Sequence, residues 1–422
     1  MSHYAVISPP FYSHLHALEA LAQELMLHGH KVTFIQQAGT MPWLGEKGPD
    51  LYTLKADPRP EKTLARTLHL ASHPGGMAVL TLIADMARHT DMLCEVLPGV
   101  LNELAVDGLI VDQMEPAGGL VAEALGLPFV SVACALPVNR ESGLPLPVMP
   151  FNYATSSRSQ KIYHSSQRVY DWMMRSHNNV INRQARRFGL PSREGLHECL
   201  SPLAQISQTI PALDFPRKAP PENFYAVGPL RQKVTATASQ FWPASPERPF
   251  VFASLGTLQG HRFRLFKTIA KACRSLDTQL LIAHCGGLNS AQSEQLQQAG
   301  ATWVTDFADQ PAVLKQAQAV ITHGGLNTVA DAVSTQTPII TVPLAFDQPG
   351  VAARVAWSGI GRRVSRFCTS ETLADNLRTV LGDESYQQRL SAMQQQLAAA
   401  GGVTRAAEIA SQALSPATEA IC

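Results

Sequence analysis

The segment Ile321–Thr328 combines residue types that bind an anion where a strand meets a helix. Gly324 and Gly325 lack side chains and would let a diphosphate approach the backbone closely. The next N–H groups lie at a helix N-terminus, where the helix dipole favours negative charge. The segment therefore predicts a diphosphate site, although an ordinary strand–helix turn with a surface histidine fits the same letters. The side-chain donors in the segment are His323, Asn327 and Thr328.

Carboxylates that follow this segment could bind the hydroxyls of a nucleotide sugar. Asp331 comes one helical turn later, where it could accept hydrogen bonds from a ribose diol. Asp347 and Gln348 lie at the next strand–helix loop, where a carboxylate and an amide could bind adjacent sugar hydroxyls. Asp347 is also a favourable helix N-cap, and the two roles are compatible.

Apolar runs alternate with helical patterns, which predicts parallel sheets that would bring these residues together. The first unit has a strand at Tyr4–Ile7, leucines at helical spacing from Leu15 to Leu25, and a strand at Val32–Ile35. Such a βαβ unit implies a parallel sheet with a right-handed crossover. Further strands are predicted at Gly108–Val111, Pro128–Val132, Phe250–Ala253, Leu280–Ala283, Trp303–Val304, Ala319–Thr322 and Ile339–Val342. Further helices are predicted at Pro116–Leu125, Phe263–Cys273, Asn327–Ser334 and Gln348–Trp357.

Two runs of this alternation predict an α/β fold of two facing Rossmann-like domains, with the ligand cleft between them at the carboxyl ends of the strands. The predicted N-terminal domain covers residues 1–230, and a linker rich in Thr, Ser, Ala and Pro covers residues 231–249. The C-terminal domain covers residues 250–395, and a helical segment covers residues 396–422. The Ala- and Gln-rich residues 385–415 are expected to pack across the outside.

Composition excludes several classes of protein. The 422 residues include 34 Lys or Arg and 33 Asp or Glu, so no global charge points to nucleic acid. Seven scattered cysteines lack the spacing of a metal or redox site, which predicts reduced thiols in a cytoplasmic protein. Neither a signal peptide nor a membrane-spanning segment is expected. The chain has no D-x-D pair for a donor metal, so the predicted site contains no metal ion.

Together these motifs resemble the donor signature of family 1 glycosyltransferases, the class of plant and mammalian UDP-sugar transferases and bacterial antibiotic glycosyltransferases. That signature starts with Trp-x-Pro-Gln, continues with Val-Leu and His-x-Gly-x-Asn-Ser/Thr, and closes with an acidic residue and Asp/Glu-Gln. The matching residues here are Phe307–Gln310, Val313-Leu314, His323–Thr328, Asp331 and Asp347-Gln348. The loop Ser254–Thr257 resembles the family's Ser-Phe/Leu-Gly-Ser/Thr loop, which implies diphosphate contacts from Gly256 and Thr257. The resemblance covers both domains up to about residue 360, and it implies a GT-B fold and a UDP-sugar co-substrate with no cofactor.

One departure from the signature concerns the ring expected to stack on uracil. Phe307 stands where the plant-type motif has Trp, and either ring offers a π-face to a base. We therefore predict that Phe307, with Gln310 beside it, belongs to the donor site. Trp303 is a competing candidate, and simple core packing is the alternative for both rings.

The loop before the first predicted helix resembles the family's Gly-His-x-x-Pro motif, whose histidine is the catalytic base. His14 aligns with that histidine, while Ser13 replaces Gly and Ala17 replaces Pro. In the family an Asp orients the base, and the match is Asp112, at the end of a predicted buried strand. The resemblance implies that His14 takes the proton of the acceptor hydroxyl while Asp112 holds the imidazole tautomer. Helix capping is the alternative for both residues.

Within the family, the chain most resembles bacterial transferases that glucosylate carotenoid diols. This implies UDP-glucose as donor, a hydrophobic hydroxylated acceptor such as a carotenoid, and one displacement that inverts the anomeric configuration to a β-glucoside. Other acceptors (a macrolide, flavonoid or sterol), a UDP-sugar epimerase, and a non-enzymatic nucleotide-sugar-dependent lipid or pigment carrier stay open as alternatives. The residues alone offer an apolar set that could line an acceptor pocket, namely Phe11, Tyr12, Met77, Met86, Leu136, Met149, Phe151 and Tyr153.

The stretch Arg158–Arg193 is basic and lies close in sequence to several aromatic residues of the predicted acceptor domain. Basic and aromatic side chains together suit contact with an anionic lipid surface, so a peripheral membrane contact is one hypothesis. The alternative is a solvated helical face that keeps the protein soluble.

Overall fold

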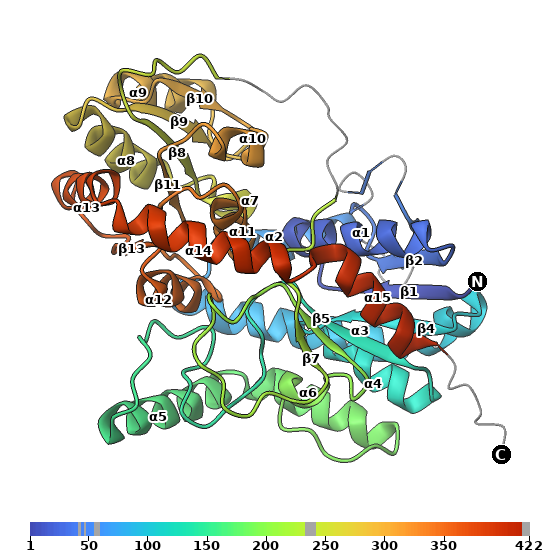
Figure 1. Ribbon diagram of the computed structural model, residues 1–422. Coiled ribbons are helices and arrows are strands. Elements are labelled where there is room, and N and C mark those ends of the chain that lie inside the picture. Colours follow the sequence, from blue (N-terminus) through green and yellow to red (C-terminus); the bar gives the residue numbers. More distant parts are fainter. Residues whose placement is uncertain (41–43, 46–47, 55–59, 233–241, 416–422) are drawn as a thin grey trace.

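Two parallel sheets form separate domains that face each other, and helices flank each sheet (Figure 1). The computed structural model describes residues 1–40, 44–45, 48–54, 60–232 and 242–415, with residues 60–62 described by their backbone alone. The two sheets confirm the predicted α/β fold of two Rossmann-like domains.

In the described part of the chain, the N-terminal sheet has seven strands in the order β3-β2-β1-β4-β5-β6-β7, all parallel. The strands are β1 (His3–Ile7), β2 (Lys31–Gln36), β3 (Asp50–Thr53), β4 (Gly108–Asp112), β5 (Phe129–Ala133), β6 (Gln205–Ser207) and β7 (Phe224–Ala226). The helices are α1 (Tyr12–Leu27), α2 (Pro60–Ser72), α3 (Ala78–Leu104), α4 (Pro116–Leu125), α5 (Ser157–Met173) and α6 (Arg175–Arg187). Because β1 pairs with β4, the loops that follow these two strands lie side by side at the carboxyl edge.

The C-terminal sheet has, among the described residues, six parallel strands in the order β10-β9-β8-β11-β12-β13. The strands are β8 (Phe250–Ser254), β9 (Gln279–Ala283), β10 (Trp303–Thr305), β11 (Ala319–Thr322), β12 (Ile339–Thr341) and β13 (Gly361–Arg363). The helices around it are α7 (Gly256–Gln259), α8 (Phe263–Ser275), α9 (Ser290–Ala299), α10 (Gln310–Leu314), α11 (Leu326–Ser334), α12 (Gln348–Ser358) and α13 (Ser370–Gly382). Again β8 and β11 are neighbours, so their following loops meet at one edge.

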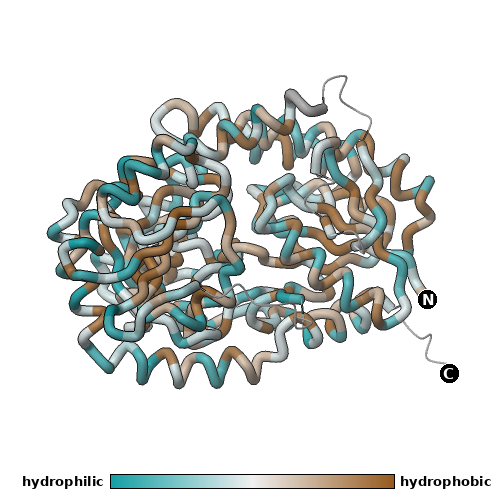
Figure 2. Tube along the Cα trace, turned by 90° about the horizontal axis from the view of Figure 1, so that it is seen from above, coloured by the Kyte–Doolittle hydropathy of each residue, from teal (hydrophilic) through white to brown (hydrophobic). Residues whose placement is uncertain are grey.

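The hydrophobic pattern explains why these segments form central strands. β4 and β8 are buried at every position, as expected of parallel strands covered by helices on both faces. Figure 2 shows hydrophobic stretches concentrated inside each of the two lobes. The predicted strands and helices all occur, with ends that agree closely.

The C-terminal helices pack on both domains. α14 (Ser385–Ala399) packs on the C-terminal domain, and α15 (Gly402–Leu414) crosses back onto the N-terminal domain (Figure 1). Val403, Ala407 and Ala410 of α15 belong to the same buried cluster as the core residues of α1 and β5. Residues 385–414 therefore lie across the outside of both domains, as expected, and the apolar face of α15 completes the core of the N-terminal domain.

A buried ion pair joins the two domains away from the cleft. Arg354 on α12 donates from Nε to Asp214 of the N-terminal domain at 2.7 Å, and Arg217 donates to the other carboxylate oxygen at 2.8 Å. Burial opposes the ionisation of Asp214, but the charges of Arg354 and Arg217 hold its pKa below the usual value. The Arg354 guanidinium also lies 4.2 Å from the centre of the Phe215 ring, so cation and aromatic ring reinforce the contact.

The segment that connects the two domains is described only at its ends. Residues 233–241, in the middle of the predicted linker, lie outside the described residues, so the linker and domain bounds remain predictions. Of the helices that the structure describes, none combines the length and the apolar character needed to cross a bilayer.

Candidate active site

A cavity of about 600 Å³ lies between the domains, where the carboxyl ends of both sheets meet. The N-terminal domain contributes the loop Pro9–His14, and the C-terminal domain contributes Ser254–Gln259, Phe307–Gln310 and Phe346–Gln348. Of the predicted site residues, all but two line this cavity. The exceptions are Asp112 and Gly324.

His14 and Asp112 form a hydrogen-bonded pair at the N-terminal edge of the cavity. His14 lies in the first turn of α1 and Asp112 is the last residue of β4, so the pairing of β1 with β4 brings them together. The distance from His14 Nδ1 to Asp112 Oδ2 is 2.7 Å, and Met114 N donates to the other carboxylate oxygen at 2.8 Å. Asp112 is fully buried, and its hydrogen bond orients the imidazole ring of His14 with Nδ1 toward the carboxylate. Nε2 is then the nitrogen that His14 can offer to a ligand.

The surroundings of His14 make it a stronger base than an ordinary histidine. Burial alone would lower the pKa of His14, but the charge of Asp112, its hydrogen bond to the ring and the charge of Asp347 together raise it. A raised pKa favours proton uptake, and it restricts the neutral, proton-accepting form to higher pH.

The capping alternatives for these two residues do not hold. The N-cap of α4 is Glu115, whose carboxylate accepts from Ala117 N, rather than Asp112. The N-cap of α1 is Phe11, and His14 uses Nδ1 to bond Asp112.

His323 lies between β11 and α11 with two glycines packed against its ring. A Cβ at Gly256 would lie 2.6 Å from His323 Cε1, and one at Gly325 would lie 2.7 Å from Nε2. Gly256 also has φ +74, a conformation that favours glycine. These glycines therefore make room for the imidazole itself, rather than only for a diphosphate. Burial lowers the pKa of His323 to about 4, so the ring is neutral and can act as an N–H donor but not as a cation.

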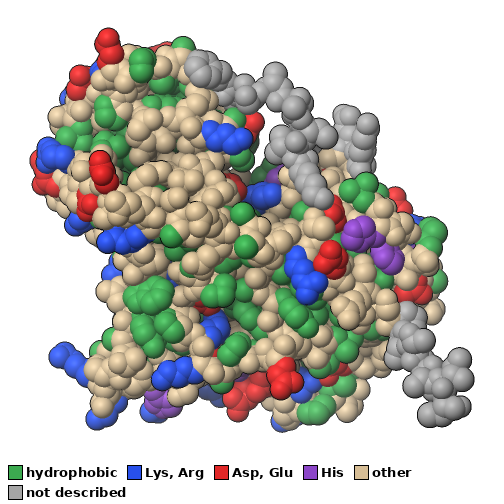
Figure 3. All heavy atoms as spheres, in the orientation of Figure 1, with side chains coloured by type: hydrophobic (Ala, Val, Ile, Leu, Met, Phe, Trp, Pro, Cys, Tyr) green, Lys and Arg blue, Asp and Glu red, His purple; other side chains and the backbone are tan. Residues whose placement is uncertain are grey.

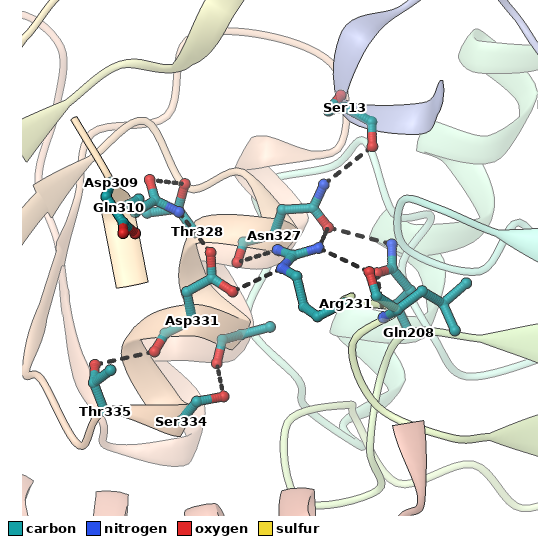
Figure 4. Close-up of polar contacts among 12 residues, drawn as sticks. Ser13, Gln208, Arg231, Asp309, Gln310, Asn327, Thr328, Asp331, Ser334 and Thr335 are labelled. Carbon is teal, nitrogen blue, oxygen red and sulfur yellow. Dashed lines mark hydrogen bonds and ion pairs between the residues drawn. The ribbon is translucent and has the colours of Figure 1, made fainter. Parts of the chain in front are cut away.

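The predicted ribose-binding carboxylate is already engaged in a network (Figure 4). Gln310 Nε2 donates to Asp331 Oδ2 at 2.7 Å, and Thr328 Oγ1 donates to Gln310 Oε1 at 3.2 Å. Arg231 donates from Nε to Asp331 Oδ1 at 2.9 Å. Sequence reasoning missed Arg231, which lies 100 residues away from Asp331. It also missed Gln208, which donates to Asn327 Oδ1 at 3.3 Å.

Asp347 reaches across the cleft instead of capping α12. It occupies the N-cap position but makes no side-chain cap bond, and its Oδ2 accepts from Leu136 N at 3.0 Å. Burial raises the pKa of Asp347, while the bond from Leu136 and the nearby His14 oppose that shift. Gln348 accepts from Leu344 N at 2.9 Å and from Ala345 N at 2.8 Å, which fixes the loop that carries Asp347.

The two candidate aromatic rings occupy different environments. Phe307 lines the cavity and is 65% exposed, so its face is open to a ligand. Trp303 packs against Phe250 and Trp242, with ring centroids 5.8 Å and 5.9 Å apart. Core packing thus accounts for Trp303 but not for Phe307. Thr257, at the start of α7, also lines the cavity.

The apolar set proposed for the acceptor pocket is only partly correct. Phe11, Tyr12, Met86 and Leu136 line the cavity. Four others are absent from its described lining, namely Met77, Met149, Phe151 and Tyr153. Tyr153 instead packs against Phe215 and Trp357, and Phe215 in turn contacts the Arg354 guanidinium of the interdomain ion pair.

The sequence did not predict a buried polar cluster in the acceptor half of the cavity, formed by Gln37, His89, Thr90 and Glu115. Thr90 Oγ1 donates to Glu115 Oε1 at 3.0 Å, and Gln37 Nε2 contacts His89 Nδ1 at 2.8 Å. Burial raises the pKa of Glu115 to about 8 and lowers that of His89 to about 4. Both groups are therefore largely uncharged at pH 7, and their 3.6 Å contact is not an ion pair. Gln37 Oε1 is buried without a partner among the described residues, so it could accept a hydrogen bond from a ligand.

One group of side chains in the described residues has the types and spacing to hold a metal ion. It consists of His14, Asp112 and Cys134, whose ligand atoms lie within 4.8 Å of one another. The hydrogen bond between His14 and Asp112 already uses two of these atoms. A reaction without metal remains a prediction.

Two Rossmann-like domains with a cleft between the carboxyl ends of their sheets form the architecture of GT-B glycosyltransferases. Among solved structures, the glycotransferase of kitacinnamycin matches with a TM-score of 0.77 at 22% identity, over 98% of this chain and 99% of that chain. This likeness confirms the predicted GT-B fold.

The chain belongs to the UDP-glucoronosyl and UDP-glucosyl transferase family, whose model matches residues 5–396. It is 56% identical to the zeaxanthin glucosyltransferase of Pantoea ananas, over 98% of this chain and 96% of that protein. It is 52% identical to the zeaxanthin glucosyltransferase of Pseudescherichia vulneris, over 98% of both. The predicted family resemblance is confirmed.

The raised pKa of Glu115 predicts a pH-dependent part of the stability. Since the folded protein holds this proton more tightly than the unfolded chain, the stabilisation is complete below about pH 4.5 and is lost as pH rises through about 8. Each tenfold difference in proton affinity between the folded and unfolded states corresponds to about 1.4 kcal/mol of folding free energy. Glu115→Gln keeps an uncharged side chain of the same shape, so its unfolding free energy should fall less than that of the wild type over this range.

Denaturant unfolding at a series of pH values measures this difference. Glu294→Gln, at an exposed position on α9, is the matched control and should keep the wild-type slope. A Glu115→Gln protein with the wild-type slope would show that Glu115 is ionised in the folded protein.

Proposed function

We propose that this protein transfers glucose from UDP-glucose to the ring hydroxyls of zeaxanthin, giving the mono- and then the di-β-glucoside. The observation that carries the proposal is the nearly full-length identity of 56% and 52% to two zeaxanthin glucosyltransferases. The acceptor half of the cavity is suited to a hydrocarbon ring. Its apolar side chains include Phe11, Leu82, Met86, Val138, Leu146 and Leu196.

In the proposed reaction, His14 Nε2 takes the proton of the acceptor hydroxyl as its oxygen attacks the anomeric carbon. The bond from that carbon to the diphosphate breaks in the same step, and UDP leaves. Asp112 stabilises the imidazolium that forms, and the imidazolium later releases its proton to solvent. One displacement inverts the configuration, so an α-linked donor gives a β-glucoside.

In the donor half, different residues are proposed to bind the uracil, the ribose, the diphosphate and the glucose of UDP-glucose. Phe307 offers its exposed face to uracil, and Asp331 with Gln310 binds the ribose diol. Asp347 lies close enough to His14 to affect its pKa, which suits a carboxylate that binds glucose beside the base, and Gln348 supports it. The proposed diphosphate contacts are Gly256, Thr257, His323, Gly324, Gly325, Asn327 and Thr328.

The test is transfer from radiolabelled UDP-glucose to a panel of acceptors, followed by chromatography. Zeaxanthin should give two products in succession, and a carotene without hydroxyls should give none. A chelator should leave the rate unchanged. The variant His14→Ala lacks the proposed base. It should still bind UDP-glucose but lose about 10²–10⁴-fold in turnover, the usual contribution of a general base. Preferred transfer to a macrolide, flavonoid or sterol would contradict the acceptor assignment, and binding of UDP-glucose without transfer would favour a carrier.

We further propose that α5 contacts an anionic membrane surface, where a carotenoid would reside. Ile162, Val169 and Trp172 are 41%, 56% and 67% exposed on this helix. Basic side chains gather over α5 at the lower left of Figure 3. They are Arg158, Lys161 and Arg168 of α5 and Arg175 at the start of α6, all exposed and without an ion pair among the described residues. By contrast, Arg183 and Arg187 of α6 pair with Asp91 and Glu95 of α3, which weakens their attraction to lipid.

Co-sedimentation with anionic vesicles tests this surface. The wild type should bind at low salt and dissociate as salt shortens the Debye length. Replacing Arg158, Lys161 and Arg168 by Glu should abolish binding, since each basic residue near the surface contributes about 1 kcal/mol. The control, Arg183→Ser with Arg187→Ser, should bind nearly as well as the wild type. Unchanged binding by the α5 variant would reject the proposal.

A further inference from the structure

Positive charge close to the phosphates stabilises a UDP leaving group, because negative charge develops there as the glycosidic bond breaks. His323 is neutral in its buried setting, so it supplies a hydrogen bond but no net charge. Among the described residues that line the cavity, the Lys and Arg side chains are Arg140 and Arg231. Arg140 lies in the acceptor half, where both its Nη atoms bond Asp171, at 2.5 Å and 3.1 Å. Arg231 is therefore the lining cation that lies beside the predicted donor residues, on Asn327 and Asp331.

Arg231 contacts both ends of the predicted donor site on α11. Its Nε donates to Asp331 Oδ1 at 2.9 Å, its Nη1 to Asn327 Oδ1 at 3.4 Å, and its Nη2 to the Asn327 carbonyl at 3.1 Å. Nη1 also donates to the Leu230 carbonyl at 3.2 Å. Figure 4 shows the guanidinium lying between Asp331 and Gln208, beside Asn327.

The chain holds Arg231 in this place from both sides. Leu230 is fully buried, and its N–H donates to Gln208 Oε1 at 2.9 Å, which fixes the backbone just before the arginine. Asp331 is 7% exposed and bonded to Gln310, so the carboxylate that orients Nε is itself fixed. The two Nη groups therefore lie on Asn327, the residue at the start of α11 that is predicted to contact the diphosphate.

We propose that Arg231 is a donor-binding residue whose Nη groups exchange the Asn327 and Leu230 oxygens for diphosphate oxygens when UDP-glucose binds, while Nε stays on Asp331. Charge-assisted bonds from guanidinium to phosphate are stronger than bonds to neutral carbonyls, which favours the exchange. The same contact stabilises the charge on UDP as it leaves. This inference rests on the proposed UDP-glucose donor.

Calorimetric titration of uridine, UMP and UDP tests the proposal, because only the phosphorylated ligands reach the Nη groups. Arg231→Gln should weaken UDP by about 10–100-fold, the cost of one or two bonds to a charged group, and change uridine affinity less than about 2-fold. Arg231→Lys should recover part of the UDP affinity. Turnover at saturating UDP-glucose should fall in both variants.

The controls separate this role from a structural one. Arg140→Gln removes the other cavity cation and should leave UDP affinity unchanged, and urea unfolding checks that each variant is folded. Equal losses for uridine and UDP in Arg231→Gln would overturn the proposal, since Arg231 would then only position Asp331. Wild-type UDP affinity in Arg231→Gln would overturn it as well. Failure of the wild type to bind UDP would instead refute the proposed donor.

Discussion

The 2.7 Å hydrogen bond between His14 Nδ1 and Asp112 Oδ2 is the interaction that fixes the imidazole at the edge of the cleft. A fully buried carboxylate is costly unless it is paired, and Asp112 is paired by His14 and by the Met114 N–H. Both partners depend on the parallel pairing of β1 and β4, which aligns the ends of the strands. The sheet therefore orients the ring, and because Nδ1 donates to Asp112, Nε2 is the nitrogen of the neutral ring that can accept a proton.

The residues proposed to bind the donor also hold the two domains against each other. Asp347 accepts from Leu136 N, and Asn327 Nδ2 donates to the Ser13 carbonyl at 3.3 Å. Arg231 adds a third bridge through Asp331. These contacts are polar and lie in the cavity, whereas Asp214 and Arg354 form a buried pair outside it. The donor residues therefore join the domains inside the cavity, and the Asp214–Arg354 pair joins them outside it.

Local sequence patterns predicted most of the fold and the cleft residues that lie at the ends of strands. Asp112 and His323 could be found because each directly follows an apolar run, and strand ends of a parallel sheet meet at one edge. The packing of α15 could not be found, since a helical pattern does not say which domain its apolar face will cover. Arg231 and Gln208 were missed for a related reason. Their partners are 96 to 119 residues away, and the segments that carry them have no motif.

The pH dependence of transfer tests most directly whether Asp112 makes His14 the base. With the wild type, kcat/KM for UDP-glucose should rise with pH to a plateau, with a midpoint above 6.5 because Asp112 and Asp347 raise the pKa of His14. In Asp112→Asn the charge of Asp112 is absent, so burial lowers the pKa of His14 with less opposition. The midpoint should move to lower pH, and the plateau should fall by about 10²–10⁴-fold while UDP affinity is retained. An Asn variant with the wild-type midpoint and rate would contradict the account.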